Sequence, residues 1–544
     1  MQIPATTTRQ EGGGLSYKWI VAIVVIFGIF MSILDSTIVN IAIPRLQGAF
    51  GADLNSVQWV LTAYILAEGV ATPLTGFFSD RIGIKRLYLL ALVVFTAGSA
   101  LCGLAWSLPA LIFFRILQGA GGAFLFPLSI TLLYREFPLH ERGMAMGVLG
   151  VPVLLAPAFG PTVGGYLVTF ADWQSIFYIN VPIGIVGIIM GMIFLREGRL
   201  NPHTRLDILG FLFSGIGLAC VLYALSDAST DGWGSSKVLG TLAAGVLLLI
   251  FFVITELSIA NSGRQPLLDV RLFADIPFTT SNIASILVTF ALYGGLFLIP
   301  VYLQDLRGLS AYQAGILLIP QAFASMIATI VGGRLVDRFG VRAVVIPGLI
   351  ILCFAMWLFS SLNLYLPFGT LQVWLILRSL SLGLCIQPLS VSMYSSIRPR
   401  DLPQATSMST AMRFVASSLG VAVLATLVQT QTSVHYTHLA EQVTPASPLG
   451  QYFVRLQGFF VAHGATLMQA KQTAIQVIAG MVQRQAYVLA MDDAFWLSLG
   501  LAIIALIAAF FVRTQPERIP QPAAGGPGGA PANQEEEPAL VAVH

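Results

Sequence analysis

The ten residues GFFSDRIGIK at positions 76–85 decide how this chain is organised, because they occur a second time in similar form. At positions 333–342, which is 257 residues further on, the sequence reads GRLVDRFGVR. Both copies keep the pattern Gly-x-x-x-Asp-Arg-x-Gly, end on a basic residue and follow a long apolar run. A repeat of this length is too long for a solenoid, and it predicts two related halves that are each large enough for six helices.

Apolar residues dominate the chain and define its class. Of 544 residues, 56% are hydrophobic and only 10% are charged, and the mean hydropathy is +0.82. So few charges cannot cover a soluble surface. Apolar runs of about 20 residues, the length that crosses roughly 30 Å of hydrocarbon, recur along the chain. The sequence therefore predicts an all-α polytopic membrane protein, and the small net charge of +3 excludes nucleic acid as a partner.

Fourteen transmembrane helices can be placed, in an arrangement of six, two and six. The predicted spans are residues 17–44, 56–78, 87–105, 108–134, 142–167, 174–195, 207–226, 237–256, 279–303, 312–333, 343–362, 366–395, 403–430 and 490–512. The two spans in the middle are additional to the two six-helix halves that the repeat predicts.

This arrangement divides the chain into five regions. They are an N-terminal cytoplasmic tail (1–16), an N-terminal six-helix bundle (17–200), two inserted transmembrane helices (206–257), a C-terminal six-helix bundle (275–513) that includes an external segment (431–489), and a cytoplasmic tail (514–544). From about residue 466 the external segment has helical spacing of apolar residues, which predicts an amphipathic helix running into the last span. The final tail is rich in Pro, Gly and Ala, so we expect it to be disordered.

Basic residues are sorted by side. If the N-terminus is cytoplasmic, nineteen of the 28 Lys and Arg residues fall on the cytoplasmic side, six fall outside and three lie within spans. The positive-inside rule then places both termini in the cytoplasm. Four cysteines lie in apolar runs without metal-ligand spacing, so we expect neither a metal site nor a cofactor. They are Cys102, Cys220, Cys353 and Cys385.

Charged residues inside spans are costly and mark functional sites. Asp35 lies about 13 Å below the outer end of the first span, and Arg115 lies about 9 Å below the outer end of the fourth. Their similar depths predict an ion pair in the outer half of the N-terminal bundle. We expect protonation of Asp35 to release Arg115 and so to couple protons to transport. A static structural ion pair is the alternative.

Three further charges lie near the middle of the membrane. Glu68 is a second proton site, an anchor for a cationic substrate, or a neutral carboxyl of the bundle core. Arg378 and Arg413 give the C-terminal bundle a buried positive character, and Arg413 is a proton-coupling candidate together with Asp35, Arg115 and Glu68. For these arginines the alternatives are a counter-ion for Glu68, an anion site, or a structural residue that reaches toward the interface.

Other polar, aromatic and Met side chains in the spans mix apolar and polar contacts, as broad-specificity sites do, although ordinary packing is the alternative for each. With Glu68, the substrate-binding candidates are Met31, Tyr64, Gln118, Tyr293, Gln321, Gln387 and Tyr394.

The repeated turn predicts a charge latch that holds one access state, because Asp80 can cap a helix end and meet nearby cations. A basic loop that only sets topology is the alternative. The latch candidates are Gly76, Asp80, Arg81, Gly83 and Arg86 in the first copy, with Asp337 and Arg338 in the second.

Several motifs together carry a family resemblance. The segment LDSTIVNIAIP at 34–44, the turn at 76–86, the segment RILQGAGG at 115–122 and a glycine pattern in the fifth span resemble the fourteen-helix drug/proton antiporters of the major facilitator superfamily, the EmrB/QacA type. The pattern is Gly147, Gly160, Pro161, Gly164 and Gly165, with Ala156 where this family has Gly. These small residues predict close helix packing, and Pro161 predicts a bend. Further similarity covers 173–182, 413–420 and 435–445.

The resemblance implies a proton-coupled antiporter of the bacterial cytoplasmic (inner) membrane that exports amphipathic, often cationic, drugs or dyes by alternating access. An exporter of an endogenous lipid, siderophore or amphipathic metabolite is the alternative, and a membrane sensor without transport is another. No HExxH, GxSxG or Walker-type motif favours an enzyme. The resemblance also implies a membrane fusion adaptor as a possible partner, and segment 431–489 is large enough to bind one. The alternative is that this segment forms a lid over the transport path or a helix at the membrane interface. The oligomeric state stays open.

Overall fold

A computed structural model describes residues 16–198, 206–264 and 266–512. The predicted C-terminal tail at 514–544, and the predicted N-terminal tail except for Ser16, lie outside these residues. Within the described ranges every regular element is helical and there is no strand. The predicted all-α class is therefore confirmed.

The helices follow the predicted order. The first group comprises α1 (Tyr17–Phe50), α2 (Leu54–Ala71), η1 (Thr72–Leu74), α3 (Thr75–Ile82), α4 (Ile84–Gly103), α5 (Leu108–Glu136), η2 (Leu139–Glu141), α6 (Arg142–Phe170), α7 (Ser175–Tyr178) and α8 (Asn180–Phe194). Two helices follow, α9 (Ile208–Asp231) and α10 (Ser236–Asn261). The last group comprises η3 (Val270–Ala274), α11 (Ile276–Val301), η4 (Tyr302–Leu306), α12 (Ala311–Phe339), α13 (Val341–Phe359), α14 (Phe368–Ser395), α15 (Leu402–Glu441), α16 (Pro448–Ala462) and α17 (Leu467–Ala509).

Length and apolarity identify the membrane-crossing helices. In the described part of the chain, thirteen helices are long and apolar enough to span a bilayer, and α11 adds a shorter apolar run at Ile276–Leu292. This agrees roughly with the predicted fourteen. The second span is formed by α2, η1 and α3 in succession, with Pro73 in the short 3₁₀ turn between the two α-helices.

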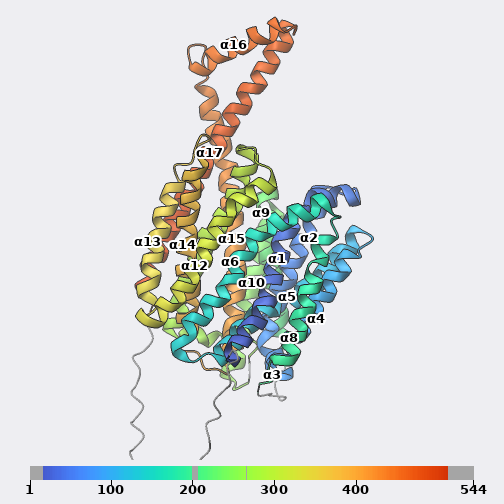
Figure 1. Ribbon diagram of the computed structural model, residues 1–544, viewed down its shortest axis with the longest axis vertical. Helices are drawn as coiled ribbons and strands as arrows, with labels where there is room; N and C mark the ends of the chain where they lie inside the picture. The colour runs from blue at the N-terminus through green and yellow to red at the C-terminus, as the bar shows by residue number, and fades with distance from the viewer. Residues whose placement is uncertain (1–15, 199–205, 265, 513–544) are drawn as a thin grey trace, which may run out of the picture.

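Contacts group the helices on either side of a long interface (Figure 1). In the first group α1 packs against α5, α6 and α8, and α4 packs against α5. In the last group α14 packs against α11, α12 and α13, while α17 packs against α11, α13 and α15. Between the groups α6 lies along α12, and α9 contacts both α2 and α15.

Glycines bring α4 and α5 into direct backbone contact. A Cβ added at Gly98 would lie 2.8 Å from Cα of Gln118, and one added at Gly121 would lie 2.6 Å from the backbone nitrogen of Phe95. No larger residue fits at either position without displacing backbone. This close approach is typical of membrane helices, which associate by packing rather than by the hydrophobic effect.

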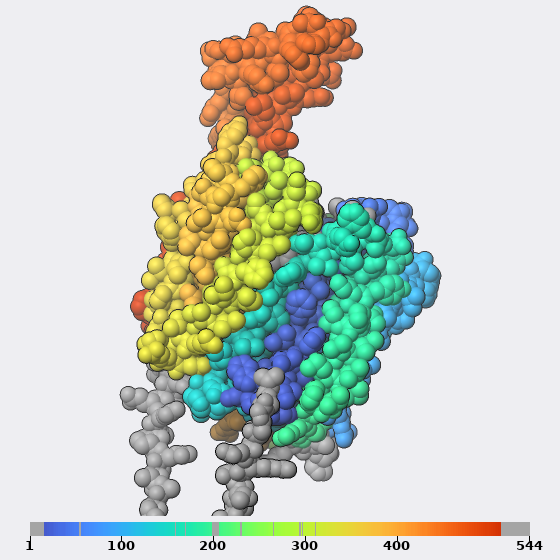
Figure 2. Space-filling model, viewed as in Figure 1, coloured from blue at the N-terminus to red at the C-terminus, as the bar shows by residue number. Residues whose placement is uncertain are grey.

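The two ends of the bundle differ. We call the end where α1 begins and α17 finishes the termini end, and the opposite end the hairpin end (Figure 1). At the hairpin end α15 continues to Glu441, α16 crosses over and α17 starts at Leu467, so that a helical projection stands clear of the bundle (Figures 1 and 2). The helix predicted from about residue 466 into the last span is therefore present, but the helical structure of α16 and of the end of α15 had not been predicted.

Candidate transport site

Asp35 is sealed in the middle of the first helix group. It lies on α1 with no solvent exposure, and its Oδ2 is 2.5 Å from Nη1 of Arg115 on α5, which is equally buried. The predicted ion pair is thus present. Gln118, one turn further along α5, donates from Nε2 to Asp35 Oδ1 at 2.9 Å. Every hydrogen bond to a buried charge of this kind is strong, because no water competes for it.

The guanidinium of Arg115 is held in one orientation by several partners. Its Nε donates to the carbonyl oxygen of Val60 on α2 at 3.0 Å, and its Nη1 also donates to Gln118 Oε1 at 2.8 Å. The ring of Tyr64 lies under it, with Cζ 4.1 Å from the ring centroid. Cation–π contact and charge pairing together fix the arginine between α1, α2 and α5.

Asn180 is a member of this network that the sequence reasoning did not assign. It is the first residue of α8, is fully buried, and donates from Nδ2 to Asp35 Oδ1 at 2.7 Å and to Ser99 Oγ at 3.1 Å. Its sequence signal was a lone polar residue two positions before Pro182, inside a stretch already noted for family similarity. Asn180 links α8 and α4 to the carboxylate on α1.

Glu68 lies close to the ion pair but does not contact it directly. Its Oε1 accepts from the hydroxyl of Tyr64 at 2.8 Å and from Ser32 Oγ at 3.4 Å. Because the same Tyr64 ring stacks on Arg115, one aromatic side chain joins the two acidic sites. A Cβ at Gly122 would lie 2.7 Å from Glu68 Oε1, so this glycine makes the space that the carboxylate occupies.

The arginines of the last helix group have different surroundings. Arg378 on α14 is 1% exposed and donates from Nη2 to the carbonyl oxygen of Leu292 on α11 at 2.8 Å. Arg413 on α15 donates from Nη2 to Ser390 Oγ at 3.0 Å and lies 5.9 Å from the ring of Phe126 in the other group. Among the described ion pairs neither arginine is joined to Glu68.

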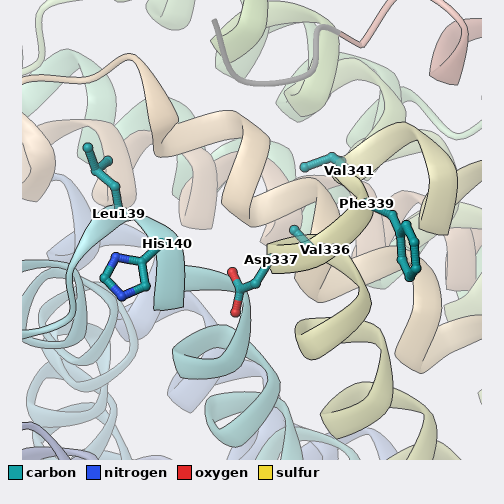
Figure 3. A pocket seen from close by; sticks show the side chains of 7 residues that line it. Leu139, His140, Val336, Asp337, Phe339 and Val341 are labelled. Carbon is teal, nitrogen blue, oxygen red and sulfur yellow. The ribbon is translucent and has the colours of Figure 1, made fainter. Parts of the chain in front are cut away.

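The second copy of the repeated turn bridges the two helix groups. Asp337, near the end of α12, accepts hydrogen bonds from the backbone nitrogens of Gly143 at 2.7 Å and Met144 at 2.8 Å. These residues form the first turn of α6, whose free N–H groups and helix dipole attract a carboxylate. The Asp337 side chain points from α12 toward that turn, beside a pocket of about 350 Å³ that also includes His140 (Figure 3).

The first copy of the turn is built around Gly83. Its φ of +94° lies in the left-handed region that favours glycine, and Gly340 occupies the matching place in the second copy with φ of +83°. Glu197 accepts from the backbone nitrogen of Lys85 at 3.2 Å and lies 3.6 Å from Nε of Arg86. The remaining predicted latch residues lie on α3, where Gly76 packs closely against α15, or at the end of α12. They are Gly76, Asp80, Arg81 and Arg338.

Further contacts close the interface toward the termini end. The rings of Tyr134 on α5 and Tyr394 on α14 meet edge to face at 5.6 Å, and the Tyr134 hydroxyl donates to the carbonyl oxygen of Ser390 at 3.1 Å. Ser407 on α15 donates to the carbonyl oxygen of Thr72 at 2.7 Å. The two groups are thus joined by hydrogen bonds on the termini side of the membrane middle.

The glycine pattern of the fifth span lies on α6 and makes close contacts on two sides. A Cβ at Gly147 would lie 2.8 Å from the carbonyl oxygen of Thr329 on α12, and one at Gly164 would lie 2.7 Å from the Ile38 side chain on α1. Gly160 abuts Thr37, also on α1, whereas a Cβ at Gly165 would meet nothing within 4 Å. Pro161 lies within α6, but its side chain lies outside the described set.

The structure distributes the predicted substrate-binding residues over several places. Tyr64 and Gln118 belong to the ion-pair network, Met31 is in the core of the first group, and Tyr394 is at the interface. Gln387 faces α6 at Gly150, and Gln321 accepts from Ser379 Oγ at 3.3 Å. The Tyr293 side chain lies outside the described set. Their roles in binding remain predictions.

Glu256 is a buried carboxylate that the sequence reasoning left at the end of a span. The structure extends α10 to Asn261, so Glu256 lies inside the helix with no solvent exposure. Asp207, which precedes α9, faces it across Gly210. The predicted span ended at residue 256, and a prediction that extended it to 261 would have placed Glu256 inside the membrane.

A bundle of apolar helices that seals an ion pair and its polar donors in its interior is typical of a multi-pass membrane transport protein. Comparison with known proteins narrows this class. The sequence model of the Major Facilitator Superfamily matches residues 25–421. The chain is 30% identical over 506 residues to the multidrug export protein EmrB of Escherichia coli, covering 92% of this chain and 95% of EmrB. It is 32% identical to the uncharacterized MFS-type transporter YhcA of Bacillus subtilis, covering 90% of this chain and 92% of YhcA.

Other relatives agree. The tetracenomycin C resistance and export protein of Streptomyces glaucescens is 31% identical, covering 78% of this chain and 80% of that protein. Among solved structures, the human organic anion transporter MFSD10 has a TM-score of 0.58 at 15% identity, covering 89% of this chain and 99% of that one, which shows a common fold. The chain therefore belongs to the Major Facilitator Superfamily, among relatives of the EmrB type. It is a transporter and not an enzyme.

Proposed function

We propose that this protein is a proton-coupled exporter that moves amphipathic drugs or dyes across the bacterial cytoplasmic membrane by alternating access. The observation that carries the proposal is the ion pair of Asp35 and Arg115, both without solvent exposure. Relatives named as multidrug and antibiotic exporters support the drug-export part. The buried carboxylate supports the proton part, because side chains of α5 and α8 both bind its charge on α1.

Protonation of Asp35 changes what the network can hold. The carboxylate now accepts hydrogen bonds from Arg115, Gln118 and Asn180. A proton on either oxygen removes the negative charge and converts one acceptor into a donor, so one of these donors loses its partner. Arg115 then carries an uncompensated charge, and α1 is less firmly tied to α5 and α8. Each proton that enters down a potential of 100 mV supplies about 2.3 kcal/mol for this change.

The interface contacts support a closed access state at the termini end. Asp337 caps α6, and Tyr134 meets Tyr394 below the ion pair. With the termini in the cytoplasm, as the distribution of basic residues favours, this state is closed to the cytoplasm. We take residues 17–200 and 275–513 as the two bundles that rock against each other, with Asp337 as a latch that breaks on the inward swing.

The cationic substrate class rests on the family resemblance of the sequence and on Glu68, which offers a carboxylate beside the Tyr64 ring. An endogenous amphipathic metabolite is the second candidate, because the arginines of the other group favour an acidic group. The projection at the hairpin end offers a surface for a membrane fusion adaptor.

Ethidium efflux from proteoliposomes under an imposed pH gradient tests the proposal. We expect efflux that stops when the gradient is collapsed. Inhibition by lipophilic anions without inhibition by lipophilic cations would favour the metabolite, and an absence of flux for both classes in folded protein would favour a sensor.

A further inference from the structure

Arg378 carries a positive charge that no side chain of the described chain neutralises. It is 1% exposed and lies about 15 Å along α14 from the hairpin end of that helix. Among the described residues its guanidinium donates one hydrogen bond, from Nη2 to the carbonyl oxygen of Leu292, and its buried Nε has no acceptor there. The described ion pairs of the last helix group do not include it.

The first helix group shows how the same fold completes such a site. By span order, α14 is the counterpart of α5, and α11 is the counterpart of α1. In the first group the arginine on α5 meets Asp35 on α1. In the last group the arginine on α14 meets Gly295 on α11, where a Cβ would lie 2.7 Å from Nη2 and 2.8 Å from Cζ of Arg378. A glycine thus stands against the guanidinium at the helix pair where the other group supplies a carboxylate.

An anion bound beside this guanidinium would lower the free-energy cost of burying its charge. Arginine stays protonated in proteins, so the group cannot lower its cost by losing a proton. A buried charge without a partner is costly, and in a membrane such a residue marks a functional site. The backbone carbonyl of Leu292 satisfies one donor but brings no full charge.

We infer that Arg378 binds an anionic group that does not belong to the protein, either the carboxylate of an exported amphipathic compound or a free chloride ion. A carboxylate matches the fork of guanidinium donors. The carboxylate source rests on the proposed export function, whereas chloride binding does not. The inference extends the substrate class to compounds with an acidic group.

Matched fluorescent probes test the site at equilibrium, without transport. Dansylglycine carries a carboxylate, and dansylglycinamide is its neutral equivalent. In detergent at low ionic strength, with a zwitterionic buffer and neither chloride nor a carboxylate salt, we expect native protein to bind dansylglycine at least about tenfold more tightly than the amide, as a charge-assisted pair implies. Arg378→Gln should remove this preference and leave amide binding unchanged, while Arg378→Lys should keep part of it. Arg334→Gln is the control, because Arg334 is an exposed arginine of the same helix group.

A second pair of variants keeps the test valid if Arg378→Gln does not fold. Gly295→Asp places a carboxylate against Arg378, so it should abolish the preference for dansylglycine while keeping thermal stability at or above the native value. Gly295→Ala shifts the guanidinium without adding a charge, because its Cβ would lie 2.7 Å from Nη2, so it should weaken the preference without abolishing it. Chloride titration of the native protein distinguishes the two anions: displacement of dansylglycine by chloride shows that both use Arg378, whereas dansylglycine binding that chloride leaves unchanged assigns the site to a carboxylate.

Some outcomes overturn the inference. Equal binding of the two probes by folded native protein, with no effect of chloride on its stability, excludes an anion at Arg378. A preference that Arg378→Gln and Gly295→Asp both retain places the anion elsewhere. Neither result affects the proposed export function, which the ethidium assay measures separately.

Discussion

Asp35 shows what a single residue contributes to this transporter. Its two oxygens accept hydrogen bonds from three side chains on two other helices, and all of these groups are buried. Depth along the helices was enough to predict its pairing with Arg115, because two opposite charges at the same depth in a membrane lower their burial cost by forming an ion pair. The other donors could not be predicted, because amide side chains carry no charge and the sequence does not give helix rotation.

Asn180 gives the first prediction. Asn180→Ala removes a donor to Asp35 and the link to Ser99, and a lost buried hydrogen bond of this kind costs about 1–3 kcal/mol. We expect a lower melting temperature and, in addition, gradient-driven flux that falls several-fold more than substrate counterflow, because the carboxylate is no longer held toward Arg115.

The control is Asn282→Ala, which removes a buried asparagine whose Nδ2 donates to the Phe278 carbonyl in the other helix group. It should lose comparable stability with no change in the ratio of driven flux to counterflow. An equal ratio for both variants would show that Asn180 is only a packing residue.

At the scale of elements, the contact of α6 with α12 organises the interface. The repeated turn predicted that Asp337 matters, yet its partner, the start of α6, became clear only when the two halves were placed together. Likewise the fifth-span glycines predicted a packing face, but not that Gly147 would face α12 while Gly164 faces α1.

The latch gives the second prediction. Asp337→Asn replaces the carboxylate at the first turn of α6, leaving one acceptor where two now bind Gly143 and Met144. The helix dipole then attracts it less, so the closed state at the termini end should lose stability by about 1 kcal/mol. Spin labels at positions 139 and 339, both exposed and on opposite groups, should report a larger fraction of long distances.

These labels require a background without the four native cysteines. The exposed Asp305, far from this contact, supplies the control variant Asp305→Asn, which should leave the distances unchanged. Distances that stay the same in Asp337→Asn would contradict the latch.

Gly333 gives the third prediction. A side chain at this position of α12 would overlap the backbone carbonyl of Gly143, which cannot move aside as a flexible side chain does. Gly333→Ala should therefore separate the two groups at the termini end and increase the long-distance fraction, at a stability cost of about 1–3 kcal/mol. Gly369→Ala, at a site with nothing within 4 Å, is the control. An unchanged distance distribution would mean that the helices slide rather than separate.

At the scale of the whole molecule, the all-α class and the membrane-spanning helices follow from composition, because a run of about twenty apolar residues is the length that crosses a bilayer as a helix. The repeated turn at 76–85 and 333–342 predicts the two related halves. The projection was harder to predict, since the end of α15 and α16 combine polar residues with scattered apolar ones and lack a bilayer-length run.

The projection gives the fourth prediction. Replacing residues 442–466 with a short Gly-Ser turn removes α16, which stands clear of the bundle and contacts α17 (Figures 1 and 2). The melting temperature of the bundle and flux in liposomes should stay close to native values. Drug resistance of cells should fall if an adaptor binds there; a loss of flux by the purified protein would instead favour a lid over the transport path.

The most direct measurement of the central claim compares native protein with Asp35→Asn in proteoliposomes, each loaded in turn with ethidium and dansylglycine. Both are measured for efflux driven by a pH gradient and for counterflow without one. We predict that native protein drives at least one compound with the gradient, and that Asp35→Asn loses the driven flux while keeping counterflow, since Arg115 keeps an amide oxygen as acceptor. Gradient-driven flux that survives in Asp35→Asn would contradict the role of this ion pair in proton coupling.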